Sequence, residues 1–338
     1  MLKGYIKKLI NRENLTIKEA EAAINIILSG ANSHQVAAFL VLLRAKKETV
    51  DEILGIIKCM QKRMLELSLS IPVLDIVGTG GDGANTINIS TGAAILAASC
   101  GVKIAKHGNR SVSSQCGSAD VLEALGVNIN LSPIKIAQCI KEIGFGFCFA
   151  PNFHPAMKTI KDIRRNLGVP TCFNILGPLL NPVPAKYLLV GVFNQELMNL
   201  MAEVILKVGI ERAMVFYGND IDELSCVGYT KVLEVTPFGI KPLVLDPKFF
   251  GFAKCTVEDL RGGTAKENAE ILLDVFKGKT GPIANTLIFN AAVALYTYGT
   301  VASIAQAIPR VINSIKDGKA LKLLNDFVVF SQAGGLHE

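Results

Sequence analysis

The sequence lacks the features that would mark it as a zinc-binding, disulfide-rich or nucleic-acid-binding protein. Its eight cysteines include no Cys-x-x-Cys pair, and none has a histidine at metal-site spacing. No dense block of lysine and arginine with interleaved aromatic residues occurs, so nucleic acid is not the expected partner. The cysteines are instead expected to be small buried hydrophobic side chains in a reducing cytoplasm.

The sequence also has little that would place it in a membrane or a secretory route. The longest uncharged stretch runs from Thr280 to Pro309, but polar residues such as Asn285 and Asn290 interrupt it. We expect a buried helix there, a break at Gly299 and a second helix. The N-terminal segment MLKGYIKKLINREN is charged throughout and does not resemble a signal peptide. A cytoplasmic protein without membrane contact is therefore expected.

Length and charge narrow the possibilities further. The chain has 338 residues, half of them hydrophobic, which is long for a single core and favours two domains. The 35 basic and 29 acidic residues leave a net charge of +6. That mild excess suits an anionic small molecule at least as well as nucleic acid.

Hydrophobic periodicity divides the chain near residue 70. The first seventy residues have helical periodicity without strands, and Thr16 with Glu19 and Thr49 with Glu52 fit capping boxes. From Ile71 onward, short apolar strands alternate with helices, which predicts an α/β domain with a mixed, largely parallel sheet. We expect an all-helical domain over residues 1–70 and an α/β domain over residues 71–338. The segment around residues 160–184 breaks the alternation and is expected to cross back to the helical domain.

Two segments rich in glycine and hydroxyl groups follow consecutive predicted strands. The first, VGTGGDGANTINIST, runs into an alanine-rich helix, and the second, AKHGNRSVSSQCGSAD, runs into a helix at Ala119. Glycine lets backbone amides approach a ligand closely, and a helix N-terminus favours phosphate. Lys106 and Arg110 add positive charge. The pattern predicts a ligand with phosphate at more than one point.

Each piece alone has a more ordinary explanation. A single GTGG is more often a tight turn, a single serine is more often a helix cap, and a single lysine is usually a solvated charge. The conjunction within about 45 residues, each piece at a strand-to-helix turn, favours the phosphate site.

Several longer motifs resemble one known family. In this order and spacing they are similar to the anthranilate phosphoribosyltransferase family of tryptophan biosynthesis: GTGGD, NIST, KHGNRSVSSQCGSADVLEALG, FHPAMK, RRNLG, FNILGPLLNP and DELS. The resemblance covers nearly the whole chain; Thr171, Cys172 and Tyr229 depart from it at positions without an assigned role. It implies a homodimer whose subunit has the nucleoside-phosphorylase type of fold. It also implies transfer of phosphoribosyl from 5-phosphoribosyl 1-diphosphate to the amine of anthranilate.

The resemblance assigns roles to individual residues. The positions implied to surround phosphoribosyl diphosphate are Gly78, Gly81, Asp82, Thr86, Asn88, Ile89, Ser90, Thr91, Lys106, Ser114 and Ser118. Anthranilate would contact Gly78, Asn109 and Arg164, with Arg164 pairing the carboxylate and Arg165 as its competitor. Mg²⁺, as two ions, would be held by Ser90, Asp222 and Glu223.

Some alternatives remain open at this level. Asp222 and Glu223 could form a solvated acidic turn, and either arginine could be a surface charge. His107, between Lys106 and Gly108, is a candidate for acid–base catalysis but is more often expected to be a structural hydrogen-bonding group. For the whole chain, the alternatives are a pyrimidine nucleoside phosphorylase and a non-catalytic relative that binds nucleic acid.

Overall fold

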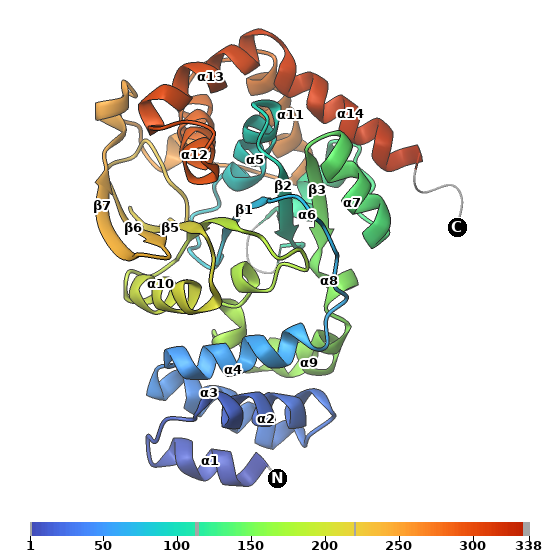
Figure 1. Cartoon of the computed structure of the whole chain (residues 1–338), viewed down its shortest axis with the longest axis vertical. Helices are drawn as coiled ribbons and strands as arrows, with labels where there is room; N and C mark the ends of the chain where they lie inside the picture. The colour runs from blue at the N-terminus through green and yellow to red at the C-terminus, as the bar shows by residue number, and fades with distance from the viewer. Residues whose placement is uncertain (1, 112–114, 220, 334–338) are drawn as a thin grey trace.

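The chain forms a helical N-terminal domain followed by an α/β domain (Figure 1). The computed structural model describes residues 2–111, 115–219 and 221–333. Four helices precede the first strand, and the capping boxes at Thr16 and Thr49 are both present. These helices are α1 (Leu2–Ile10), α2 (Ile17–Leu28), α3 (Ser33–Lys46) and α4 (Val50–Gln61).

Seven strands form one sheet within the described residues, in the order β3-β2-β1-β4-β5-β6-β7. The first five run parallel, and β6 and β7 form an antiparallel hairpin at one edge. This confirms the predicted mixed, largely parallel sheet. The strands are β1 (Leu74–Gly78), β2 (Ile104–Gly108), β3 (Phe145–Phe149), β4 (Tyr187–Gly191), β5 (Arg212–Tyr217), β6 (Thr230–Thr236) and β7 (Gly239–Leu245).

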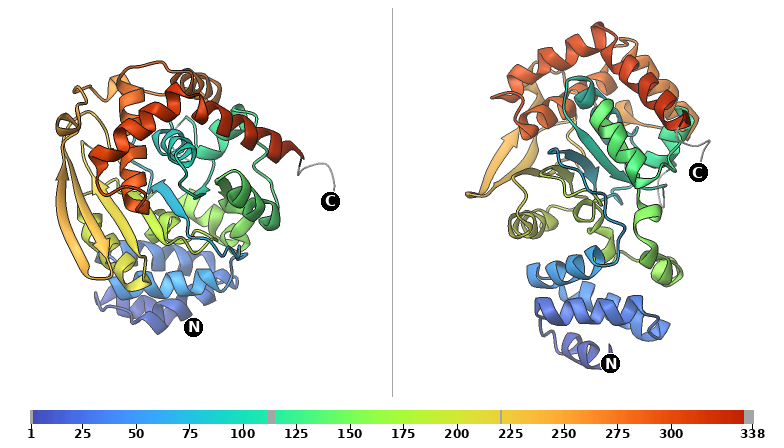
Figure 2. Two further views of the ribbon diagram at one scale, coloured as in Figure 1. Left: turned by 45° about the horizontal axis from the view of Figure 1, so that its top comes forward. Right: turned by 45° about the vertical axis from the view of Figure 1, so that its right-hand side comes forward.

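Helices cover both faces of the sheet, and each face has its own core. Leu189 packs into the core shared with α5 and the C-terminal helices, whereas its neighbours Leu188 and Val190 pack into the core shared with the N-terminal domain. Figure 2 shows these two layers from further directions. The remaining α-helices are α5 (Ile89–Ser99), α6 (Ser118–Ala124), α7 (Pro133–Glu142), α8 (Ala150–Phe153), α9 (Lys158–Leu167), α10 (Glu196–Val208), α11 (Ala265–Phe276), α12 (Pro282–Tyr298), α13 (Ile304–Lys316) and α14 (Lys319–Ala333).

The segment that interrupts the strand–helix alternation lies beside the N-terminal helices. α9 contacts α2 and α3, and its buried Ile160 belongs to the same core as Phe39 of α3. The break at Gly299 between α12 and α13 is also as expected, with Gly299 in the left-handed conformation that ends α12. No helix among the described residues is both long and apolar enough to cross a lipid bilayer.

Local boundaries differ from the sequence expectation by a few residues. β1 begins at Leu74 instead of Ile71, since Pro72 has no N–H to donate to a neighbouring strand. β2 extends to Gly108, two residues beyond the end of the predicted strand VKIAK, so His107 is also part of the sheet. α5 begins at Ile89, which lies before the alanine-rich part of the predicted helix.

Candidate active site

The predicted ligand-binding loops lie at the same side of the sheet, beyond the carboxyl ends of its parallel strands. From β1 the chain continues to β2 and β3 on one side, and later to β4 and β5 on the other side. The boundary between β1 and β4 is therefore the topological switch point, where ligands bind beyond the carboxyl ends of parallel strands. The segments that follow β1, β2 and β5 all start at these carboxyl ends and contain the two glycine-rich loops and the DELS motif.

The loop after β1 is rich in glycine, so its backbone can lie close to other groups. Gly80, Gly81 and Gly83 have φ values of 69°, 87° and 73°, a region that favours glycine. Gly78 is needed for a different reason, since a Cβ placed there would overlap the carboxylate of Asp222. The tight loop therefore presses directly against the acidic segment that follows β5.

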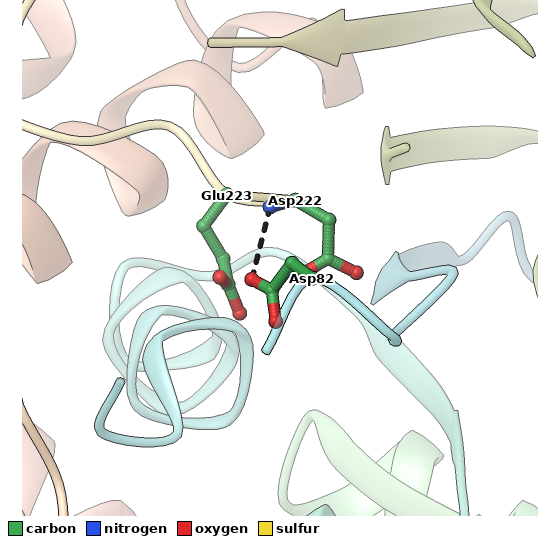
Figure 3. A group of neighbouring side chains, drawn as sticks. All are labelled: Asp82, Asp222 and Glu223. Carbon is green, nitrogen blue, oxygen red and sulfur yellow. Dashed lines mark hydrogen bonds between the residues drawn. The ribbon is translucent and has the colours of Figure 1, made fainter. Parts of the chain in front are cut away.

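Three carboxylates gather at this contact. Asp82, Asp222 and Glu223 each offer an oxygen within 4.8 Å of the others, and Asp82 of the glycine loop lies between the two consecutive acids (Figure 3). The Gly80 N–H donates to Asp222 Oδ2 at 2.6 Å. Asn219, with φ of 58°, ends the extended backbone after β5, which allows two adjacent acids to face one site.

The electrostatics of these acids favour a bound cation. Burial and the neighbouring Asp82 raise the pKa of Asp222, and burial together with Asp222 raises the pKa of Glu223 well above its ordinary value. Glu223 Oε2 is buried without a hydrogen-bond partner in the described part of the chain. Clustered carboxylate oxygens with unused lone pairs are the donor set that Mg²⁺ prefers, so the residues fit a divalent cation.

Lys106 lies behind this cluster, inside the sheet. It is 2 % exposed, and its Nζ donates to Ile76 O at 2.7 Å and to Ser90 Oγ at 3.3 Å. Burial lowers the pKa of Lys106, while Asp75 and Glu223 act in the opposite direction. Lys106 therefore joins Ser90, at the start of α5, to the backbone of β1, and its charge is close enough to Glu223 to interact with it.

The loop after β2 differs from the expectation in one respect. Arg110 is not a free positive charge, because its guanidinium pairs with Asp120 and Glu123 of α6. Ser118 Oγ donates to the backbone oxygen of Asn109 at 3.2 Å and so helps close the loop. Ser114, predicted to bind phosphoribosyl diphosphate, lies outside the described residues.

The other predicted residues of the first loop are buried or bonded to other protein groups. Thr86 forms an antiparallel bridge with Arg261, and Ile89 begins α5 as a fully buried residue. Thr91 is also fully buried, and its Oγ1 has no partner among the described residues. Asn88 is the N-cap residue of α5, and other protein groups occupy its side-chain amide.

Comparisons with known proteins agree with this geometry. Two family models match, the helical bundle domain of a glycosyl transferase family over residues 3–64 and its α/β domain over residues 70–321. The anthranilate phosphoribosyltransferases of Chlamydia felis and Methanosarcina acetivorans are 46% and 47% identical to this chain. They cover 98% of it in both cases, and 97% and 90% of their own lengths.

Solved structures give the same result. The anthranilate phosphoribosyltransferase of Thermus thermophilus superposes with a TM-score of 0.91 at 38% identity, over 97% of this chain and 99% of the other. The Saccharomyces cerevisiae enzyme in complex with PRPP and Mg superposes with a TM-score of 0.92 at 31% identity, over 98% of both chains. This chain belongs to the anthranilate phosphoribosyltransferase family.

In this member of the anthranilate phosphoribosyltransferase family, the two neighbouring arginines of α9 lie in different environments. Arg165 is exposed and pairs with Asp162 at 3.0 Å. Arg164 is half-buried, its guanidinium carbon lies 5.5 Å from the centre of the Phe173 ring, and it has no acidic partner among the described residues. Burial lowers its pKa. Arg164 is thus the arginine with an unused charge.

His107 and Asn109 extend from the end of β2. His107 is 5 % exposed, its Nδ1 lies 3.1 Å from Gly177 O, and burial lowers its pKa to about 3. Its ring centre is 5.2 Å from that of His154. Asn109 is exposed, and its Oδ1 accepts from the Arg110 N–H at 2.8 Å. A neutral imidazole bonded to a carbonyl is the arrangement of a structural histidine.

One buried acid of this site was not singled out from the sequence. Asp75 of β1 is fully buried, and it accepts from the His107 N–H at 3.2 Å and from Asn181 Nδ2 at 2.8 Å. Asn181 also donates to Ala105 O and so connects the crossover segment to β1 and β2. The available signal was a charged residue within the apolar strand VLDIV, because a charge on a strand buried on both faces needs dedicated partners.

Proposed function

We propose that this chain transfers the phosphoribosyl group of 5-phosphoribosyl 1-diphosphate to the amine of anthranilate, releasing diphosphate. The observation that carries this proposal is the meeting of the glycine loop with Asp222 and Glu223 at the switch point of the sheet. A phosphorylase that uses inorganic phosphate has no diphosphate to hold through metal ions, so the acidic cluster favours the transferase.

Departure of diphosphate is the step that the site must assist. Breaking the bond from C1 to oxygen leaves positive charge on the ribose and builds negative charge on the leaving group. We assign the binding of phosphoribosyl diphosphate to Gly78, Gly81, Asp82, Thr86, Asn88, Ile89, Ser90, Thr91, Lys106, Ser114 and Ser118. Backbone amides of the glycine loop and the N-terminus of α5 would bind the phosphates. Lys106, which donates a hydrogen bond to Ser90, would add positive charge.

Magnesium would be held by the acidic cluster. We assign Asp222, Glu223 and Ser90 as its ligands, and the position of Asp82 between the two acids supports adding it to the set. The number of ions that we propose, two, follows from the family resemblance. Mg²⁺ would neutralise charge on the diphosphate as it leaves. The protein's part is to hold several carboxylates close together in a buried site.

The acceptor side needs positioning more than acid–base chemistry. An aromatic amine is neutral near pH 7 and keeps a usable lone pair, so correct placement beside C1 supplies much of the rate. We assign Arg164 to the carboxylate of anthranilate, with Gly78 and Asn109 as further contacts. Arg164 is half-buried and has no ion pair with any described acid, which supports that choice over the exposed and paired Arg165.

We further propose that the chain works as a cytoplasmic homodimer, without a nucleic-acid or membrane partner. The N-terminal helices are the proposed contact, because Ile10 of α1 is 61 % exposed and Val41 of α3 is 40 % exposed. α1 and α3 pack against each other, which places both side chains on one small helical domain.

Product analysis tests the proposed function. Purified protein would be incubated with anthranilate, phosphoribosyl diphosphate and Mg²⁺, and diphosphate release followed by ³¹P NMR. We expect diphosphate and N-(5-phosphoribosyl)anthranilate in equal amounts. Cleavage of thymidine or uridine by inorganic phosphate would instead indicate the phosphorylase. Salt-dependent DNA binding without turnover would indicate the non-catalytic relative.

A further inference from the structure

Residues 260–262 form backbone hydrogen bonds with the loop that follows β1. The Ile87 N–H donates to Leu260 O at 2.9 Å, and the Gly262 N–H donates to Asn85 O at 2.9 Å. A Cβ on Gly262 would lie 2.9 Å from the Ile87 Cα, so the two backbones are in direct contact. Residues 85–87 therefore have a pairing partner beyond the main sheet.

Asn268 of α11 connects the same segment to Asn88 of the candidate site. It is 1 % exposed, and its Oδ1 accepts from the Gly263 N–H at 2.8 Å. Its Nδ2 donates to Asn88 Oδ1 at 2.9 Å, and Asn88 Nδ2 donates to Cys116 O at 3.1 Å. One line of hydrogen bonds thus runs from α11 through the loop after β1 to the loop after β2.

Backbone groups at the two ends fix the direction of this line. The Gly263 N–H can only donate, so the oxygen of the Asn268 amide must face it and the nitrogen must face Asn88. The Cys116 carbonyl can only accept, so the nitrogen of Asn88 must face it. Each amide therefore uses its oxygen and its nitrogen in one orientation, and a residue without both groups cannot replace Asn268.

We propose that Asn268 is a positioning residue that holds the two phosphate-binding loops in register for phosphoribosyl diphosphate, acting through Asn88. The inference rests on the proposed function and deepens it. Both ends of the buried Asn268 amide are occupied by protein groups, Gly263 and Asn88, so we assign it no contact with the ligand. Its effect on binding comes from fixing Asn88, and with it the spacing between the loop at Asn88 and the loop at Cys116.

Replacing Asn268 by leucine tests this inference. Leucine has a similar volume but leaves the Gly263 N–H without its partner and removes the donor to Asn88. Binding of phosphoribosyl diphosphate with Mg²⁺ would be measured by titration calorimetry, and the KM values by turnover. We expect Kd and KM for phosphoribosyl diphosphate to rise about tenfold or more, with KM for anthranilate within about twofold of the unaltered protein.

Val275→Ala is the matched control on the same helix. Val275 is 2 % exposed and packs in the core, so its truncation loosens α11 without touching the amide line. We expect a lower Tm but an unchanged Kd for phosphoribosyl diphosphate. If Asn268→Leu does not fold, Asn268→Ala replaces it with a smaller perturbation. Wild-type affinity in the Asn268 variant, or an equal loss in Val275→Ala, would overturn the inference.

A double-mutant cycle separates positioning from general stabilisation. If Asn268 acts through Asn88, Asn268→Ala should weaken binding in the original protein but add little in an Asn88→Ala background. Full additivity of the two effects contradicts the inference while leaving the proposed function intact. Failure of the unaltered protein to bind phosphoribosyl diphosphate at all would overturn both, so the two failures are distinguishable.

Discussion

The carboxylate of Asp222 accepts a hydrogen bond of 2.6 Å from the backbone N–H of Gly80 and lies against the Cα of Gly78. Two segments 142 residues apart in the sequence thereby form one site. The contact leaves no space for a side chain at residue 78. It ties the position of the acidic cluster to the shape of the glycine loop.

Gly78→Ala should therefore damage the site more than the small size of a methyl group suggests. The added methyl group would displace the Asp222 carboxylate, and such overpacking costs about 1 to 3 kcal/mol, which corresponds to roughly 5- to 150-fold in binding. We expect the Mg²⁺ concentration for half-maximal activity to rise within this range. Gly4→Ala is the control, because a Cβ there has nothing within 4 Å. Unchanged Mg²⁺ dependence in Gly78→Ala would contradict the packing described for Asp222.

Asp222→Asn should stabilise the metal-free protein while removing activity. The pKa of Asp222 is raised in the folded state, so the folded protein binds more protons than the unfolded chain, and stability falls as pH rises through that pKa. A neutral amide avoids this cost. At pH 8 without metal, we expect Tm to increase by about 2 °C or more. The increase should shrink as pH is lowered.

Magnesium should reverse that order of stability. Binding to the folded state alone stabilises it, so Mg²⁺ should raise the Tm of the unaltered protein and have little effect on Asp222→Asn. Differential scanning fluorimetry with and without Mg²⁺ measures both effects. If Mg²⁺ stabilises both proteins equally, it binds elsewhere, and the assignment of Asp222 as a ligand is wrong.

Replacing each of the two neighbouring arginines of α9 by alanine should have unequal effects. Arg164→Ala removes a half-buried charge that has no acidic partner in the described part of the chain, and a lost charge-assisted hydrogen bond costs about 1.5 to 3 kcal/mol. We expect KM for anthranilate to rise roughly 10- to 150-fold, with little change in KM for phosphoribosyl diphosphate. Arg165→Ala removes only an exposed pair with Asp162 and should change neither value by more than about twofold. Equal effects of the two changes would contradict the assignment.

His107 should stay uncharged throughout the working pH range. Burial lowers its pKa to about 3, so the imidazole is neutral from pH 5 to 9. NMR of ring-labelled histidine should show no titration of His107 above pH 5, and the pH profile of kcat should have the same shape in His107→Gln. An inflection near pH 6.5 in the unaltered protein that disappears in this variant would instead assign His107 an acid–base role.

Much of the fold was predictable because the signals for it are local. The capping boxes at Thr16 and Thr49 and the break at Gly299 depend on neighbouring residues, and all three are present. Strand ends were less predictable. β2 continues beyond Lys106 to His107 and Gly108. His107 has its buried partner, Gly177 O, 70 residues away in the sequence, and no local pattern reveals such a partner.

The candidate site was predictable to the extent that its residues lie in glycine-rich loops. The role of Asp82 beside Asp222 and Glu223 needs tertiary structure, since the glycine loop and the DELS motif meet only in the folded chain. The pairing of Arg110 with Asp120 and Glu123 was hidden for the same reason. Asn268 belongs to no motif that the sequence displays, so only its two hydrogen bonds in the folded chain identify it.

The fluorescence of anthranilate provides the most direct test of the central claim, which is that a metal-dependent site for diphosphate lies beside a site for an aromatic acid. Purified protein would be mixed with anthranilate and phosphoribosyl diphosphate, first with EDTA and then with excess Mg²⁺. We expect a stable signal in EDTA and a steady loss of anthranilate fluorescence once Mg²⁺ is added. A signal that stays constant with both substrates and Mg²⁺ present would contradict it.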